Sequence, residues 1–325
     1  MASPFDGFEV DKALRPSARG LAFDLQQALD AVVVLHAQVP EDASTAEALG
    51  TERLGNGIVI GTSGLVLTIG YLITEAEEVT LLTNDGREVP AHVLGYDQVT
   101  GFGLVNALEP LDLPALPLGD SRTLRSGDPV ILAGGGGRAH ASAGRLIARS
   151  PFVGYWEYML NEALFVGPAH PHWSGAALIG ASGALMGVGS LQMNQETADG
   201  RPALINMCVP IELLPPIVDD LSRGRVFRLP RPWLGVYCQD VDGAVVVMDV
   251  ARGGPADRAD VRRGDRILAV DGEPVADLAE VYGKLWFLGE AGIVVPLRLK
   301  RGRDVLDLEI ATVDRASRLK KRRFN

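Results

Sequence analysis

Short apolar runs separated by turn residues fill the chain from residue 55 to residue 148. The runs at 57–60 and 65–68 flank Thr62-Ser63-Gly64, and the runs at 79–83 and 88–94 flank Asn84-Asp85-Gly86-Arg87. Asn, Asp and Gly in such short connections favour tight turns between antiparallel strands. Strands at this spacing predict an antiparallel barrel or sandwich. Further runs of the same kind lie at 103–107, 129–133 and 144–148.

Two stretches of this region have apolar residues at helical spacing instead. The first lies between 21 and 32 and predicts a short amphipathic helix that runs into a strand at 31–38. The second predicts a helix over 211–224 that ends at a glycine. Residues 1–24 then form an N-terminal arm, and residues 25–224 form one domain. The apolar positions of the first helix are Leu21, Leu25, Ala28, Leu29 and Val32.

A compact second unit follows a proline-containing stretch. Residues 225–232, with Pro230 and Pro232, are predicted to be a linker. The next 81 residues, 233–313, alternate strand-like runs with one amphipathic helix and form the second domain, which a basic tail over 314–325 follows. The predicted elements are strands at 233–238, 244–250 and 266–270, a helix at 278–288 and a hairpin at 294–311.

The acidic balance of the chain narrows the class of partner. Its 325 residues carry 31 Lys and Arg against 41 Asp and Glu, a net charge of −10. This balance argues against nucleic-acid binding by the body of the protein. The stretch 315–325 holds six basic residues and no acidic one. We expect a solvated end there, with a contact to an acidic partner as the alternative.

The cysteines, the histidines and the apolar runs exclude several kinds of site. Cys208 and Cys238 fall in different predicted domains, so we expect two buried, inert thiols rather than a disulfide. The five histidines lack the spacing of metal ligands, and we expect neither a metal nor another cofactor. No run reaches the length of a membrane span or of a signal peptide. The chain as written is expected in the cytoplasm, or in the periplasm if its true start lies upstream.

Ser174 lies in a stretch with candidate chemistry, His172-Trp173-Ser174-Gly175-Ala176. A serine on a glycine-flanked turn before apolar runs resembles the nucleophile region of the trypsin-like HtrA/Deg proteases, whose usual pattern is Gly-Asn-Ser-Gly-Gly. Further blocks extend the resemblance in the family's order over roughly 290 residues. It implies a mainly β protein, in which a trypsin-like double β-barrel is followed by a PDZ domain. The blocks are 57–68, 80–86 and 97–100, then Trp233-Leu-Gly-Val236, Gly253-Gly-Pro-Ala256 and Arg263-Gly-Asp265.

The resemblance also assigns residues to the positions of the catalytic triad. Ser174 takes the nucleophile position, Tyr71 that of the histidine base, and Gly101 that of the aspartate which orients the base. A serine hydroxyl is a weak nucleophile until an adjacent base accepts its proton. Tyrosine, with an ordinary pKa of about 10, keeps its proton at neutral pH, and glycine has no side chain to orient anything. His172 falls at the oxyanion-hole position, where the family usually has a glycine.

Three functions are compatible with these residues. The lost base and carboxylate favour a protease domain that no longer cleaves, with Ser174 as a remnant nucleophile. An active serine endopeptidase is the alternative, for which His170 or His172 would have to serve as a non-standard base. The third function is an assembly module, since the family often forms trimers through N-terminal segments. The helix from Leu21 is the candidate contact of such a homotrimer.

The resemblance to a PDZ domain implies a peptide-binding site. PDZ domains receive a C-terminal carboxylate on a loop of backbone N–H groups, and the peptide extends a sheet edge. We therefore expect protein C-termini or extended segments as partners, in protein quality control or in a regulatory scaffold. The matching loop is Leu234, Gly235 and Val236, and the candidate pocket walls are Leu278, Tyr282 and Leu285.

Overall fold

The structure is a computed structural model of the chain, and it describes residues 7–196, 200–225 and 229–320. The chain forms two compact units. The second unit contains Pro151–Asn161 together with the described part of Phe227–Leu319, and the first unit contains the other described residues. The stretch 151–161, predicted within the first domain, thus belongs to the second unit. Part of the predicted linker, 226–228, lies outside the described residues.

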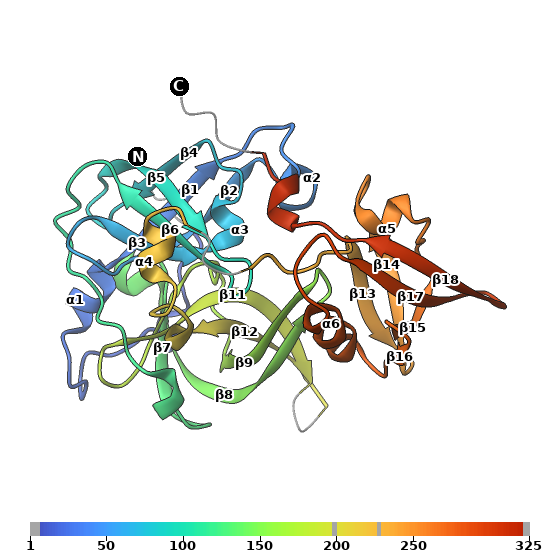
Figure 1. Cartoon of the computed structure of the whole chain (residues 1–325). Helices are drawn as coiled ribbons and strands as arrows, with labels where there is room; N and C mark the ends of the chain where they lie inside the picture. The colour runs from blue at the N-terminus through green and yellow to red at the C-terminus, as the bar shows by residue number, and fades with distance from the viewer. Residues whose placement is uncertain (1–6, 197–199, 226–228, 321–325) are drawn as a thin grey trace. The chain divides into compact units, whose positions relative to one another are not determined.

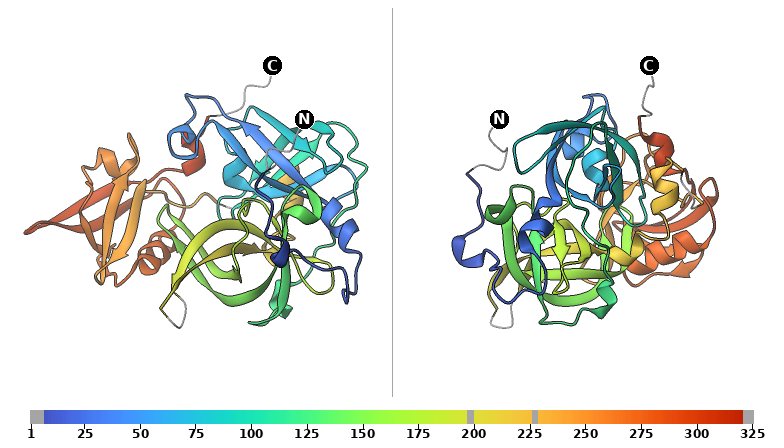
Figure 2. Two further views of the ribbon diagram at one scale, coloured as in Figure 1. Left: turned by 180° about the vertical axis from the view of Figure 1, so that it is seen from behind. Right: turned by 90° about the vertical axis from the view of Figure 1, so that its left-hand side faces the viewer.

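The first barrel consists of six antiparallel strands, drawn in blue to cyan in Figures 1 and 2. They are β1 (Val32–Gln38), β2 (Glu52–Val59), β3 (Leu65–Ile69), β4 (Glu78–Leu82), β5 (Glu88–Tyr96) and β6 (Phe102–Ala107). The order is β1-β2-β3-β6-β5-β4, and the barrel closes because β1 pairs with both β2 and β4. Both predicted hairpins form, as β2–β3 and β4–β5. Two one-turn helices accompany the strands, α2 (Ala46–Leu49) and α3 (Gly70–Ile73).

The second barrel is also a closed set of six strands, drawn in green to yellow. They are β7 (Pro129–Ala133), β8 (Ala141–Gly154), β9 (Tyr158–Gly167), β10 (Ala177–Ile179), β11 (Leu185–Glu196) and β12 (Pro202–Pro210). Their order is β10-β11-β12-β9-β8-β7. Apolar side chains from five of the strands, such as Leu132, Leu164 and Leu178, fill a core in which Cys208 of β12 is also buried. The predicted double β-barrel is confirmed.

The second unit is built on one sheet in the strand order β13-β14-β15-β17-β18, with β16 paired to β15. Its strands are β13 (Val236–Val241), β14 (Ala244–Val250), β15 (Arg266–Val270), β16 (Glu273–Pro274), β17 (Val294–Arg301) and β18 (Asp304–Ala311). Two helices complete it, α5 (Pro255–Arg258) and α6 (Leu278–Phe287). Asp277 caps α6 by accepting the N–H of Glu280, and the helix buries Val281 and Leu285 in the core.

The predicted helix over 211–224 is wrong as a single element. A 3₁₀ turn covers Ile211–Leu213, and a separate α-helix, α4, covers Val218–Ser222. Pro215 and Pro216 lie between them. Proline has no N–H to donate and disfavours helical geometry in the residue before it, so the pair interrupts the helix in spite of its apolar spacing.

The predicted N-terminal helix is shorter than expected and faces its own unit. It is α1 (Leu25–Asp30), capped by Asp24, whose carboxylate accepts the N–H groups of Gln26 and Gln27. Its apolar residues Leu25, Ala28 and Leu29 are all buried. These side chains therefore do not form an exposed contact for a homotrimer, and trimer formation stays a prediction.

Both ends of the chain pack more than expected. In the arm, Val10 is buried and its N–H donates to the carbonyl of Ala139 at 2.9 Å. In the tail, the Arg318 guanidinium donates to the carbonyl of Gly253 at 3.0 Å. Residues 316–318 are exposed, as expected for a solvated end, and the Arg318 contact is the addition that the structure makes to that prediction. Residues 321–325 lie outside the described part of the tail.

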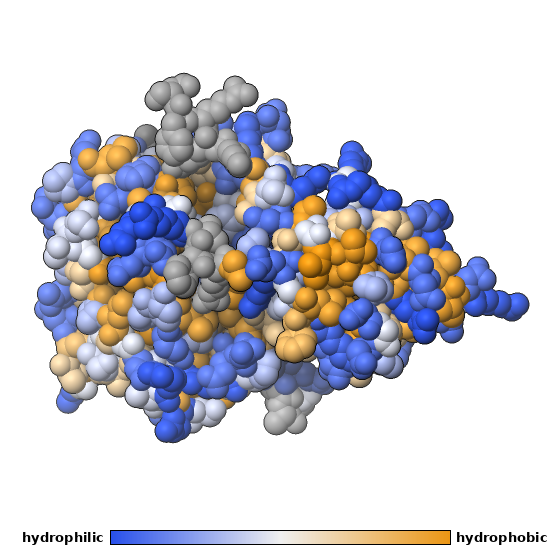
Figure 3. All heavy atoms as spheres, in the orientation of Figure 1, coloured by the Kyte–Doolittle hydropathy of each residue, from blue (hydrophilic) through white to orange (hydrophobic). Residues whose placement is uncertain are grey.

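Both thiols are buried, as the sequence predicts. Cys208 and Cys238 are free and buried, and burial raises the pKa of the Cys208 thiol to about 12. On the face drawn in Figure 3, hydrophobic residues gather in patches among hydrophilic ones. Within the described ranges, no helix has the length and apolar character needed to cross a bilayer.

Candidate active site and peptide-binding loop

The loop that carries Ser174 is held by one buried side chain from the first barrel. Asn56 on β2 donates from its amide to the carbonyls of His172 and Ser174, each at 2.9 Å. Its side-chain oxygen accepts the N–H of Gly135 at 2.8 Å, and its own backbone N–H donates to the Ser174 carbonyl at 2.8 Å. Asn56 has no exposed surface. The position of Ser174 is therefore fixed through its backbone.

Two glycines let the same loop pack without space for a side chain. Gly175 has a φ of +75°, and a Cβ there would lie 2.1 Å from the carbonyl oxygen of Asn56. A Cβ on Gly189 would lie 2.1 Å from the carbonyl oxygen of Trp173. Separations this short are impossible for real atoms, so the backbone on both sides of Ser174 requires glycine.

The hydroxyl of Ser174 meets the phenol of Tyr71. Tyr71 lies at the start of α3, directly after β3, and its Oη is 2.7 Å from Ser174 Oγ and 2.7 Å from the Ser190 carbonyl oxygen. A carbonyl only accepts and a phenol has one proton, so the Tyr71 proton goes to Ser190. The short contact with Ser174 then requires the serine hydroxyl to donate to Tyr71. The proton of the Ser174 hydroxyl is thus directed at Tyr71 Oη, an oxygen that already has its own proton.

Burial strengthens this arrangement. It raises the pKa of the Tyr71 phenol above its ordinary value, and the hydrogen bond to Ser174 only partly opposes that shift. The acceptor carbonyl of Ser190 is exposed to Tyr71 because the pairing of β11 with β12 shifts register between Gly189 and Leu191. At neutral pH Tyr71 is therefore a neutral hydrogen-bond partner of Ser174, which cannot accept its proton.

Gly101 lies next to this pair but contributes only backbone. Its carbonyl accepts the N–H of Gly70 at 2.7 Å, and its own N–H donates to the carbonyl of Asp97 at 2.8 Å. Its φ of +83° is in the left-handed region that glycine adopts without strain. The residue at the predicted carboxylate position thus shapes the turn before β6 and offers no charge to the neighbourhood of Tyr71.

The histidines near Ser174 are engaged by backbone groups. His170 has no exposed surface, its Nε2 lies 2.9 Å from the carbonyl of His140, and its Nδ1 lies 3.0 Å from the N–H of His172. The carbonyl needs a donor and the N–H an acceptor, so the proton is on Nε2. Burial lowers the pKa of His170 to about 4 and keeps the ring neutral. Both nitrogens of His170 are used in holding the loop.

The His170 ring also engages the backbone N–H at the predicted oxyanion-hole position, His172. The N–H of His172, which the hole would need, donates to the ring of His170. The His172 ring is in turn 3.1 Å from the carbonyl of Phe8, and the Phe8 ring meets it edge-on at 6.0 Å. Sequence reasoning missed Phe8, because no local pattern connects an N-terminal residue to a loop that far along the chain.

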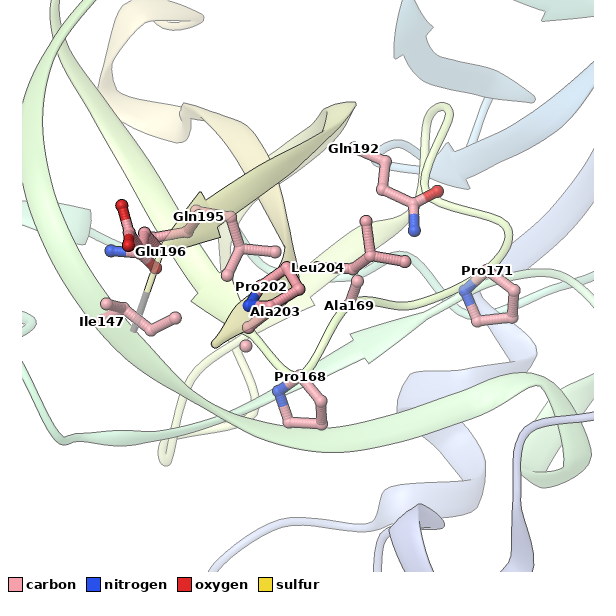
Figure 4. Close-up of a pocket in the computed structure, with 12 residues that line it drawn as sticks. Ile147, Pro168, Ala169, Pro171, Gln192, Gln195, Glu196, Pro202, Ala203 and Leu204 are labelled. Carbon is pink, nitrogen blue, oxygen red and sulfur yellow. The ribbon is translucent and has the colours of Figure 1, made fainter. Parts of the chain in front are cut away.

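A cavity of about 890 Å³ lies in the second barrel, among residues of β8, β9, β11 and β12 and the stretch after β9 (Figure 4). Its lining is mostly apolar, and Figure 4 shows Pro171 and Gln192 at one end and Ile147 and Glu196 at the other. Pro171 directly precedes His172. Sequence reasoning missed this cavity because its walls come from separate strands.

The predicted peptide-binding loop already holds a carboxylate of this chain. The N–H of Leu234 donates to Glu157 Oε2 at 3.1 Å, and those of Gly235 and Val236 donate to Oε1 at 2.7 and 3.1 Å. Glu157 lies in the turn between β8 and β9, residues 154–157, which we call the β8–β9 turn. Sequence reasoning missed Glu157, for which the only signal is a turn between two long strands.

The predicted pocket walls divide into two kinds. Leu278 and Leu285 are buried in the core of the second unit. Tyr282 is also buried, but its hydroxyl reaches the β8–β9 turn, where it donates to the Gly154 carbonyl at 3.0 Å and accepts the N–H of Glu157 at 3.0 Å. The tyrosine therefore contacts a segment of this chain at the place where a peptide was predicted.

The architecture agrees with known proteins. Residues 55–188 match the model of the trypsin-like peptidase domain, and residues 232–312 match that of the PDZ domain. The HtrA-type protease AlgW with a decapeptide has a TM-score of 0.54 at 21% identity, with 90% of this chain and 97% of that chain covered. A serine endoprotease from Yersinia pestis has a TM-score of 0.52 at 24% identity, with 90% and 99% covered. The protein is thus a trypsin-like peptidase fold followed by a PDZ domain.

Sequence relatives define the family. HhoA of Synechocystis, a serine protease by name, is 30% identical over 298 residues, which are 79% of this chain and 70% of the relative. The serine endoprotease DegS of Escherichia coli is 26% identical, with 81% and 77% covered. A DegP-like periplasmic serine endoprotease of Pseudomonas fluorescens is 27% identical, and this chain spans about half, 51%, of its length. The chain belongs to the HtrA/Deg family of serine proteases with a PDZ domain.

The contacts of Asn56 predict a large loss of stability when they are removed. Asn56→Ala leaves the N–H of Gly135 and the carbonyl of His172 buried without this partner, so the free energy of unfolding should fall by about 3 kcal/mol. Asn106→Ala is the matched control, because Asn106 is half-buried and its amide donates to the carbonyl of Ala107. Urea denaturation of the full chain measures both, and equal losses would contradict the role of Asn56.

Glu157 predicts a pH-dependent stability. Burial raises its pKa to about 7 from an ordinary 4.5, against the lowering effect of the three N–H donors and Arg315. Between these two pH values the folded protein binds the proton and the unfolded chain does not, so the free energy of unfolding falls as the pH rises. Glu157→Gln should lack this contribution. Its difference from the natural protein, followed by urea denaturation, should change between pH 4.5 and 7 and stay constant above. A constant difference throughout would contradict the assignment.

Proposed function

We propose that the protease domain of this HtrA/Deg-family protein no longer cleaves peptide bonds, and that the protein acts by binding protein segments through its PDZ domain. The observation that carries the first half is the contact between Ser174 and Tyr71. The Ser174 hydroxyl donates a hydrogen bond to a phenol that keeps its own proton, so no base at this position takes the proton from the nucleophile.

The chemistry of acylation makes this replacement costly. Attack by serine on a carbonyl requires that the hydroxyl proton moves to a base, which later returns it to the leaving amine. Loss of the base from such a triad lowers turnover on the order of a millionfold. A phenol with a raised pKa cannot replace it at neutral pH, and Gly101 supplies no carboxylate to hold a substitute base.

The oxyanion site supports the same proposal. A tetrahedral intermediate needs N–H donors aimed at its negative oxygen. One of the two expected donors, the N–H of His172, is directed to the ring of the neutral His170. Catalysis through the hole would first require this bond to break, which adds to the barrier that the missing base creates.

The alternative is an active serine endopeptidase with Ser174 and a non-standard base. The named relatives HhoA and DegS, which are proteases, favour it. An active endopeptidase requires either that Tyr71 loses its proton and becomes a phenolate, or that His170 is released from its two backbone hydrogen-bond partners. Burial opposes the first, since it raises the pKa of Tyr71, and the hydrogen bonds of a buried neutral imidazole oppose the second.

The PDZ domain supports the second half of the proposal. Its loop of three N–H groups suits a carboxylate, which is how such domains capture a chain end. Solved neighbours include the HtrA-type protease AlgW with a decapeptide and with a tripeptide. By this likeness we infer protein C-termini or extended segments as ligands, in quality control or in a regulatory scaffold.

Three further expectations stay predictions. The compartment is one, since the chain was expected in the cytoplasm or the periplasm and the DegP-like relative is named as periplasmic. The second is the homotrimer. The third is the lack of nucleic-acid ligands, which the net charge of −10 supports.

The proposal predicts no hydrolysis that depends on Ser174. The natural protein and Ser174→Ala should degrade unfolded casein at the same background rate, and neither should be labelled by a fluorophosphonate probe, because the serine proton has no acceptor. Cleavage by the natural protein that Ser174→Ala abolishes would refute the proposal. Tyr71→His with Gly101→Asp should restore little, since the N–H of His172 stays engaged with the His170 ring and the oxyanion hole lacks this donor. Adding His172→Gly should give the larger gain.

The PDZ half predicts that a free carboxylate decides binding. Decapeptides ending in an apolar residue should bind the full chain as free acids and lose at least about tenfold in affinity when their C-terminus is amidated, with intrinsic binding on the order of −7 to −8 kcal/mol. Fluorescence anisotropy with matched free-acid and amidated peptides measures this. Equal binding of the two forms would exclude capture of a carboxylate.

A further inference from the structure

We propose that the carboxylate-binding loop of the PDZ domain holds the protein's own Glu157 as its resident ligand, so that an external C-terminus binds only after the β8–β9 turn leaves. The inference rests on the proposed peptide-binding function and adds that Glu157 competes with an external C-terminus for the loop. The ligand class is a chain ending in a free α-carboxylate, because that group presents the same pair of oxygens as the Glu157 side chain.

All three donors of the loop are directed at this single carboxylate. Gly235 and Val236 share Glu157 Oε1, and Leu234 donates to Oε2. A carboxylate that accepts several backbone N–H bonds is the geometry by which such loops bind a chain end. Each of the three N–H groups therefore already has a partner. An incoming C-terminus must compete with Glu157 for every one of them.

The backbone of the turn reproduces the second element of peptide recognition. Strand β13 stands at one end of the strand order of its sheet. The N–H of Cys238 on β13 donates to the carbonyl of Tyr155 at 2.9 Å, two residues before Glu157. A bound peptide adds to a sheet edge through main-chain bonds of this kind. The β8–β9 turn thus occupies the strand edge and the loop together.

Side chains around the turn anchor it to the domain. Val153 and Met159, on the two strands that the turn connects, pack against the hydrophobic core of the PDZ domain. Tyr282 bonds to both ends of the turn, and Arg315 donates to the carbonyl of Trp156 at 3.2 Å. Glu157 is therefore held in the loop by its whole surroundings, which also explains why 151–161 belongs to the second unit.

The conformation of Glu157 is a further sign that its side chain matters there. Its φ is +57°, in the left-handed region. Residues other than glycine, asparagine and aspartate seldom adopt this region, because the Cβ crowds the following carbonyl. Glycine would suit the turn better on backbone grounds alone. The contacts of the carboxylate with the loop offset this strain.

The test uses the full chain in four forms. Glu157→Gly removes the carboxylate and suits the positive φ, while Glu157→Gln keeps the shape of the side chain and removes its charge. Glu162→Gln is the matched control, since Glu162 on β9 is an exposed carboxylate that pairs with Arg149 rather than with the loop. The natural protein is the reference.

The first measurement needs no ligand. Hydrogen exchange of the segment 234–238 should be slow in the natural protein and at least about tenfold faster in Glu157→Gly, with a smaller gain in Glu157→Gln. The control should exchange like the natural protein. Unchanged exchange in both Glu157 variants would overturn the proposal, whatever peptides bind.

The second measurement uses dye-labelled decapeptides that end in Val, Leu or Phe with a free carboxylate. Their Kd should be at least about tenfold lower for Glu157→Gly than for the natural protein, because the competing state is lost. Equal Kd values with unchanged exchange would overturn the resident ligand and leave the peptide-binding function standing. Faster exchange without peptide binding in any form would support the resident ligand and refute the peptide-binding function.

Discussion

The buried side chain of Asn56 is the interaction on which the candidate active site depends. It connects a strand of the first barrel, the residues after β7 and the loop of Ser174 through hydrogen bonds to backbone groups. None of these bonds involves Tyr71 or Gly101. The loop is therefore stable whether or not a base stands beside Ser174. Folding requires satisfied buried polar groups, whereas catalysis requires a proton acceptor, so the shape of this loop does not depend on a catalytic base.

The fold could be predicted from the sequence where the signal is local. Short apolar runs and turn residues such as Asn84-Asp85-Gly86 predict hairpins that the first barrel contains. The prediction of one helix over 211–224 is wrong because Pro215 and Pro216 remove the N–H donors that a continuous helix needs, which outweighs the apolar spacing. The contacts of the arm and the tail could not be predicted, since hydrogen bonds from Val10 or Arg318 to carbonyls distant in sequence give no signal in a local pattern.

The site could be predicted in part, and through resemblance rather than periodicity. The motif order brought Tyr71 and Ser174 together, and their oxygens are 2.7 Å apart. The direction of the proton could not be predicted, because it depends on the Ser190 carbonyl that a register shift presents to Tyr71. Glu157 was missed for a related reason. It lies 77 residues before Leu234, and no local pattern connects a glutamate in a turn between two strands to a loop that far along the chain.

The two candidate sites share one physical feature. Each contains backbone N–H groups placed where a protease or a PDZ domain binds an anion, an oxyanion in one case and a carboxylate in the other. In each, a side chain of this chain accepts those bonds, the His170 ring for His172 and the Glu157 carboxylate for residues 234–236. The acceptors differ in a way that matters. A buried neutral imidazole holds its N–H as part of the core, whereas a carboxylate on a turn competes with ligands of the same charge. Under the two proposals, the first arrangement closes a site and the second regulates one.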